Sequence, residues 1–233
     1  MKKSIIITRN RTNIVMALVA VAMATLVLAA TSANADVLLE TGFDGTSNDG
    51  STLSNITYTT ENSLTGPSSL SGASQSPTHS LFTTPNATGH YAPSVNINNG
   101  EWNVDIPLTV TGAAVQISDV ILGRQHFNGS GNFNGTYLNR SYPIIVTLSG
   151  ASAGQVGQVT LDPGAGDWGG PAGVETFSFG TPVTLTSSDT WTLNLQVGDG
   201  GGIGGGIFVG FDGFAVQGTV VDPATSGTLI YGK

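Results

Sequence analysis

The carboxylates are the side chains of this sequence with the most obvious chemistry, and their spacing argues against glycoside hydrolysis. Glu101 and Asp105 are the nearest pair on one predicted strand. Four residues of extended chain separate them by about 13 Å, whereas the carboxyl pairs of glycosidases stand roughly 5–10 Å apart. We therefore interpret both as solvated residues on an outer face.

Motifs for other reactions are also missing. His79, His90 and His126 are scattered without metal-ligand spacing, and no Gly-x-Ser-x-Gly marks a nucleophile. The glycine loop at 198–206 joins two strands and lacks the Lys-Ser/Thr step of a phosphate-binding loop. We expect a protein without enzymatic activity.

Sugar binding would use exposed aromatic rings with polar groups nearby. Trp168 is the best candidate, because it lies beside Asp167 in a polar loop with no alternation to place it inside. Tyr91 and Tyr137 are the next candidates. Together these residues predict a ligand-binding surface for a glycan.

Arg124 and Arg140 are the only cations between the N-terminal segment and the last residue. Arg124 could bind a sugar acid or pair with a carboxylate, and we favour pairing. Trp102 and Trp191 fall on apolar strand faces, which predicts that they lie in the core.

The first 35 residues read as a secretory signal. Basic residues open the chain, an uncharged apolar run occupies 14–30, and Ala33-Asn34-Ala35 offers a cleavage site. The alternative is an uncleaved anchor, for which a 17-residue run is short. We expect a signal helix at 1–35 and a protein that is secreted or held in the periplasm or cell envelope.

Cleavage would leave three basic residues against 15 acidic ones, a formal charge of −12. Such a chain should bind neither nucleic acid nor anionic lipid, which leaves cations and neutral polymers as partners. It has no cysteine, so sheet and core must stabilise it without disulfides.

The elements that position these residues are strands. Apolar and polar residues alternate at 102–111, 142–148 and 191–197, with turn signals between them. Alternation over so much of the chain favours an antiparallel two-sheet sandwich spanning 36–221, followed by a tail at 222–233. A change of phase near Ser118-Asp119 predicts a bulge, Gly180-Thr181-Pro182 predicts a kink, and Pro107 predicts an edge position or a bulge.

The last apolar run, 207–221, has apolar residues on both faces, so we expect a strand that is covered above and below. Its Asp212 shares a predicted face with Phe208 and Phe214, where a carboxylate needs hydrogen bonds, a cation or water. The Ser/Thr/Asn-rich tract at 46–99 predicts long loops, which serve either as cover or as a binding face.

Three stretches resemble exported bacterial β-sandwich domains of the LamG or concanavalin-like jelly-roll type, many of which occur in PEP-CTERM proteins. They are LLETGFDG at 38–45, TFSFGTPVTL at 176–185 and GFDGFAVQG at 210–218. The sequence departs from that class at its end, where Val221-Asp222-Pro223-Ala224 stands in place of the Pro-Glu-Pro motif. We therefore do not expect surface anchoring, and the alternatives are release, periplasmic retention or a truncated gene model.

The resemblance implies that the first and last strands lie together, and that acids on both can hold a structural calcium. Glu40, Asp44 and Asp212 are the residues in those positions. The other interpretation is that Asp44 and Asp212 are turn or bulge residues bonded to nearby N–H groups.

We therefore expect a non-catalytic jelly-roll module for carbohydrate or another extracellular polymer. The alternatives are a structural envelope or matrix protein without a small ligand and, third, a polysaccharide-degrading enzyme.

Overall fold

The computed structural model describes residues 35–60, 64–72, 79–97, 100–134, 142–162, 172–198 and 206–221. The chain divides into two units, Met1–Ala35 and Asp36–Lys233. The signal helix expected at 1–35 lies outside the described residues apart from Ala35, as does the tail at 222–233. No helix of the described chain is long and apolar enough to span a membrane.

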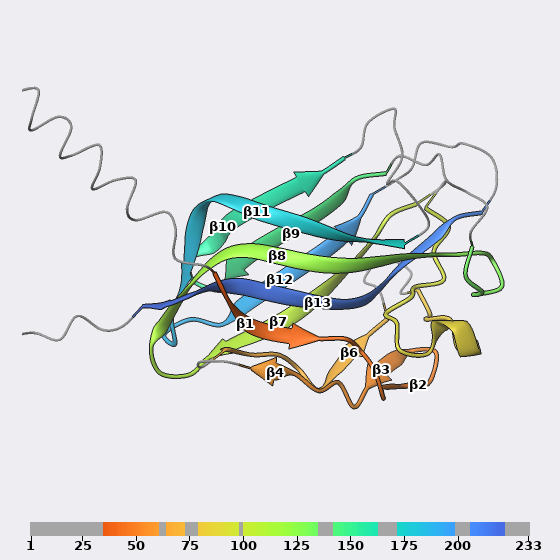
Figure 1. The fold of residues 1–233 in the computed structure, drawn as a ribbon, viewed down its shortest axis with the longest axis horizontal. Helices are drawn as coiled ribbons and strands as arrows, with labels where there is room; N and C mark the ends of the chain where they lie inside the picture. The colour runs from red at the N-terminus through yellow and green to blue at the C-terminus, as the bar shows by residue number, and fades with distance from the viewer. Residues whose placement is uncertain are drawn as a thin grey trace, which may run out of the picture. The chain divides into compact units, whose positions relative to one another are not determined.

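The second unit is an antiparallel β-sandwich, as the alternation predicted (Figure 1). The strands of the first sheet, in spatial order, are β11 (Ala172–Leu185), β8 (Ala114–Phe127), β13 (Phe208–Val221), β1 (Asp36–Thr41) and β4 (Thr59–Thr60). Those of the second are β10 (Gly154–Leu161), β9 (Ile144–Gly150), β12 (Trp191–Val197), β7 (Trp102–Val110) and β5 (Leu64–Thr65).

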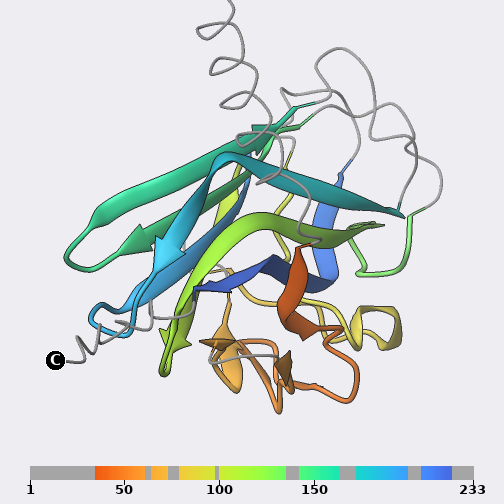
Figure 2. The same ribbon diagram turned by 60° about the vertical axis from the view of Figure 1, so that its left-hand side comes forward.

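From β7 onward the chain crosses from one sheet to the other at each connection except that between β9 and β10, as in a jelly roll. Thus β7 leads to β8, β10 to β11, β11 to β12 and β12 to β13 across the sandwich. Figure 2 shows the two layers from the side. The first and last strands, β1 and β13, are paired neighbours, which confirms that implication of the resemblance.

Inward-facing apolar side chains from both sheets form one core. In β7 and β12 every second residue is buried, including Trp102 and Trp191, which confirms their predicted place. Pro107 faces β12 on one side only, because β5 pairs with just the last two residues of β7. Among the described residues, Pro107 therefore has no partner on the β5 side of β7, which agrees with an edge position, one of the two interpretations of this proline.

Two irregularities expected from the sequence are present. The register between β8 and β13 shifts at Ser118, where β8 carries an extra residue. The pairing of β11 with β8 is interrupted between Ser178 and Val183, around the Gly-Thr-Pro sequence. A change in alternation marks the first place and turn-forming residues mark the second, which is why both could be predicted.

The closing strand differs from the expectation in one respect. A second bulge lies between Phe211 and Gly213, so Asp212 has no partner on β8. The bulge reverses the alternation, so Phe211 and Phe214 both face the core while Asp212 is exposed. The prediction that Asp212 shares a face with Phe214 was wrong, as was the prediction that both faces of this strand are covered.

The tract at 46–99 is more ordered than the loops we expected. A small sheet of β2 (Ser47–Asn48), β3 (Thr52–Ser54) and β6 (Ser69–Ser71) and a 3₁₀ turn, η1 (Pro85–Ala87), lie within it. Its Leu53 and Leu70 are buried in the core. Residues 95–97 are described and form no strand.

Candidate functional site

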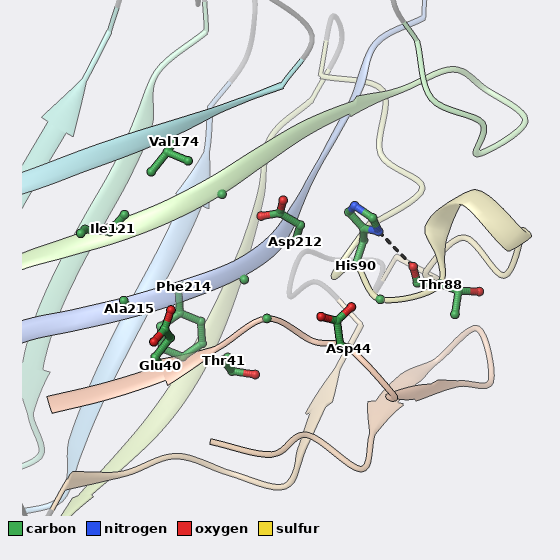
Figure 3. Close-up of a pocket in the computed structure, with 14 residues that line it drawn as sticks. Glu40, Thr41, Asp44, Thr88, His90, Ile121, Val174, Asp212, Phe214 and Ala215 are labelled. Atoms are coloured by element: carbon green, nitrogen blue, oxygen red, sulfur yellow. Dashed lines mark hydrogen bonds between the residues drawn. The ribbon is translucent and has the colours of Figure 1, made fainter. Parts of the chain in front are cut away.

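An open pocket of about 450 Å³ lies on the outer face of the first sheet, where β1, β13 and β8 meet the loop around His90. Figure 3 shows its side chains. We call it the acidic hollow, and it is lined by Glu40, Thr41, Gly42, Asp44, Thr88, Gly89, His90, Ile121, Gly123, Val174, Asp212, Gly213, Phe214 and Ala215. Its volume is within the range of small-ligand sites.

Asp212 takes its place in the acidic hollow from two backbone features. The bulge at β13 turns its side chain to the outer face, and the neighbouring strand has no side chain at Gly123. A Cβ atom at position 123 would overlap the Asp212 carboxylate. The carboxylate therefore lies directly over the backbone of β8. Any residue other than glycine at position 123 would fill this space with its Cβ atom.

Asp44 enters the hollow from the turn that follows β1. Phe43 before it has a φ of 54°, an uncommon conformation for a non-glycine residue. The Asp44 carboxylate lies in ordinary contact with the positions that a Cβ would take at Gly42 and Gly89. In Figure 3 Asp44 and Asp212 stand on opposite sides of the same opening, with His90 beside both.

His90 is the functional candidate that sequence reasoning missed. Its Nδ1 donates to the Thr88 carbonyl oxygen at 3.1 Å, which orients the ring. The ring makes edge contacts with Phe127 and Phe133, each at a centroid distance of 5.5 Å. The loop at 79–97 has no periodic pattern, so only the isolated motif Gly89-His90 could have drawn attention to it.

The three acids expected to bind calcium, Glu40, Asp44 and Asp212, do line one pocket. However, in the part of the chain that the structure describes, no three His, Cys, Asp or Glu side chains are grouped closely enough to hold one metal ion. Calcium prefers six to eight oxygen ligands. The arrangement therefore offers no preformed metal centre, and calcium stays a prediction for experiment.

Tyr91 was predicted to be an exposed platform, and this was wrong. It is 1 % exposed and its ring packs on Trp102 at 5.8 Å. Its backbone pairs with Phe211 of β13, which draws the ring into the core. The hydroxyl donates to the Ser71 carbonyl oxygen at 2.7 Å.

Arg124 forms the ion pair that we favoured, with its Nη2 at 3.1 Å from Oε1 of Glu175. Its side chain is fully buried, so it presents no face to a ligand here. Its Nη1 lies 3.1 Å from Nε2 of His126, which in turn lies 2.6 Å from the Tyr142 hydroxyl. Because guanidinium can only donate, Nε2 accepts and the neutral ring carries its proton on Nδ1.

This buried group joins the two layers, since Arg124 and His126 are on β8 and Tyr142 precedes β9. Burial, together with the nearby Arg124 charge, lowers the pKa of His126 to about 4. Burial also raises the pKa of Tyr142. His126 is therefore neutral in the folded protein at neutral pH.

The remaining candidates, Trp168, Asp167 and Tyr137, lie outside the described residues. Of the residues named from sequence, the structure therefore brings Glu40, Asp44 and Asp212 to one place. Tyr91 and Arg124 instead lie in the interior of the protein.

The acidic hollow can accept several hydrogen bonds and donate a few. Carboxylates of Glu40, Asp44 and Asp212 are acceptors, and Thr41 and Thr88 carry hydroxyls. No Lys or Arg is among its lining residues, all of which the structure describes. The arrangement suits ligands that carry many hydroxyl groups and no negative charge.

No protein-family model matches this chain. No curated protein matches it either. Among solved structures, an arabinose-bound MgGH51 α-L-arabinofuranosidase is similar at 14% identity over 67% of this chain and 23% of that chain, with a TM-score of 0.35. A likeness this distant carries no argument about function. The LamG and PEP-CTERM resemblance stays a prediction.

Proposed function

We propose that this protein is an exported, non-catalytic β-sandwich module that binds a neutral carbohydrate polymer in the acidic hollow. The proposal rests on the position of the Asp212 side chain. A bulge in β13 and a side-chain-free position in β8 together place one carboxylate in an open pocket facing Asp44 and His90.

The chemistry supports a polyhydroxylated ligand. A carboxylate has two oxygens that can accept bonds from adjacent hydroxyl groups, and charge-assisted hydrogen bonds of this kind are stronger than neutral ones. The acids repel anionic polymers, and the predicted charge of −12 after signal cleavage adds to this repulsion.

A glycan array with the full chain tests the proposal. Asp212→Asn and Asp44→Asn should each weaken binding about tenfold or more, because an amide replaces half of the acceptor capacity by donors. Asp105→Asn is the matched control. Asp105 lies on β7 in the second sheet and accepts from Asn194 at 2.7 Å, so that variant should bind like the wild type.

The array also separates this site from the loop predicted from sequence. Trp168→Ala should leave binding largely unchanged if the acidic hollow is the site. If Trp168→Ala lost glycan binding while Asp212→Asn kept it, the proposal would be contradicted. Binding to no glycan would leave the structural envelope role, and release of sugar would support the enzyme.

Calcium is tested separately by melting the protein with calcium and with chelator. A higher melting temperature with calcium, lost in Asp212→Asn, would assign the ion to these acids. A melting temperature that does not change with chelator would show that calcium does not stabilise the fold.

A further inference from the structure

We infer that the ligand is a chain of at least two linked sugar units, one held in the acidic hollow and its neighbour stacked on Phe133. The inference rests on the proposed function and deepens it. It starts from an aromatic ring that is exposed on a rigid loop directly beside the hollow.

Phe133 is unusual among the aromatic residues that the structure describes. Its exposed fraction is 49%, and the other large apolar residues exposed in the described ranges are two valines, Val156 at 37% and Val174 at 75%. Leaving such a ring in water forgoes part of the free energy that burial would supply. A single exposed ring next to a polar pocket suits the apolar face of a sugar better than a broad protein interface.

The Phe133 ring lies next to the wall of the acidic hollow. His90 lines the hollow, and its ring meets that of Phe133 in an edge-to-face contact at 5.5 Å with an interplanar angle of 66°. Phe133 also lies against Phe127, at 5.6 Å and 41°. A ligand leaving the hollow on the His90 side therefore reaches the Phe133 ring next.

The loop that carries Phe133 is held from inside. The Asn128 side chain accepts from the backbone N–H groups of Ser130 and Asn132 at 2.9 and 3.1 Å. Gly131 has a φ of 72°, and a Cβ there would press on the ring of Phe82.

Backbone contacts also hold the chain at Phe133 and at the residue after it. Phe133 forms a bridge with Phe127, and the N–H of the next residue, Asn134, donates to the His126 carbonyl oxygen at 3.0 Å. The neighbouring loop adds a bond from the Thr84 hydroxyl to the Gly131 carbonyl oxygen at 2.6 Å. A ring held in this way loses little conformational entropy on binding.

The test compares monosaccharides with hexasaccharides by titration calorimetry on the full chain. The probes are glucose with cellohexaose, xylose with xylohexaose, and mannose with mannohexaose. Phe133→Ala should weaken hexasaccharide binding about tenfold and leave monosaccharide binding within about twofold. Phe133→Trp should keep hexasaccharide affinity, and its added indole should become shielded from acrylamide quenching when hexasaccharide binds.

Val156→Ala is the matched control, because Val156 is an exposed apolar residue on β10 in the second sheet. If Phe133→Ala weakens binding of both ligand lengths equally, or of neither, the Phe133 subsite is overturned. The acidic hollow itself would still stand as the site if Asp212→Asn weakened binding about tenfold or more. If the wild type binds none of the three hexasaccharides, the proposed function for linear neutral glycans fails with it. Should Phe133→Ala unfold, an unprotected indole in Phe133→Trp overturns the inference.

Discussion

At the level of single residues, Gly123 determines where the Asp212 carboxylate can lie. Asp212 is exposed, and its oxygens occupy the space that a Cβ at position 123 would fill. A methyl group there meets the far end of a side chain that can swing into water. The consequence should fall on ligand binding and hardly on stability.

Gly123→Ala is therefore expected to change the free energy of unfolding by no more than about 1 kcal/mol. It should weaken glycan binding as much as Asp212→Asn does, because both remove the seated carboxylate. Urea unfolding and titration calorimetry measure the two effects. A Gly123→Ala protein that binds normally would show that the position of this carboxylate is irrelevant.

His126 is the residue whose protonation should couple to folding. Its pKa is lowered from 6.5 to about 4 by burial and by the Arg124 charge, while Tyr142 and Glu175 complete the buried group around Arg124. Between pH 6.5 and 4 the unfolded chain binds a proton that the folded chain does not. Stability from this group is therefore complete above pH 6.5 and falls as the pH drops toward 4.

The wild type should lose on the order of 2 kcal/mol through His126 between pH 7 and pH 4. His126→Gln cannot take up this proton, so its stability should fall less over the same interval. Urea unfolding at half-unit steps of pH measures the difference between the two profiles. Parallel profiles for the two proteins would remove His126 as the source of acid sensitivity.

At the level of elements, the strand pair β1–β13 carries the hollow and depends on close approach of two backbones. A Cβ at Gly213 would overlap the carbonyl oxygen of Thr41 on β1. Unlike the overlap at Gly123, this one involves main chain, which cannot move without disturbing the pairing.

Gly213→Ala should therefore destabilise the protein by about 2 kcal/mol and weaken ligand binding, since the hollow is built on this pair. Gly180→Ala is the matched control, because nothing lies within 4 Å of its added Cβ. It should stay within about 0.5 kcal/mol of the wild type in urea unfolding. Equal stability of the two variants would contradict the close packing of β1 on β13.

The sequence predicts the strands well and one of the two bulges of the β8–β13 pair. Around Ser118 apolar residues on both sides mark the phase change, so the extra residue is visible in the pattern. Around Asp212 the flanking Gly210 and Gly213 carry no side chains to reveal a phase. Hence the reversal that exposes Asp212 could not be found from alternation alone.

The candidate site was predictable only in part, because strand pairing could be inferred and the course of a loop could not. The pairing of first and last strands, implied by resemblance, correctly grouped Glu40, Asp44 and Asp212. His90 comes from a loop whose course depends on long-range contacts, including the bridge between Tyr91 and Phe211. That bridge also buries Tyr91, which no local pattern indicates.

At the level of the whole molecule, the two outer faces of the sandwich differ in what they offer. The first sheet carries the acidic hollow and, through His90, the Phe133 loop. On the second sheet, the outward acids Glu101 and Asp105 accept hydrogen bonds from Gln196 and Asn194 of the neighbouring strand. We therefore expect a glycan to bind the outer face of the first sheet.

Amide chemical-shift mapping of the isotopically labelled protein, titrated with a hexasaccharide that binds, shows which face the glycan occupies. We predict that the largest shifts fall on Gly42, Gly89, Gly123 and Asp212, with further shifts on the Phe133 loop. Shifts confined to β9, β10 and β12 of the second sheet would contradict it.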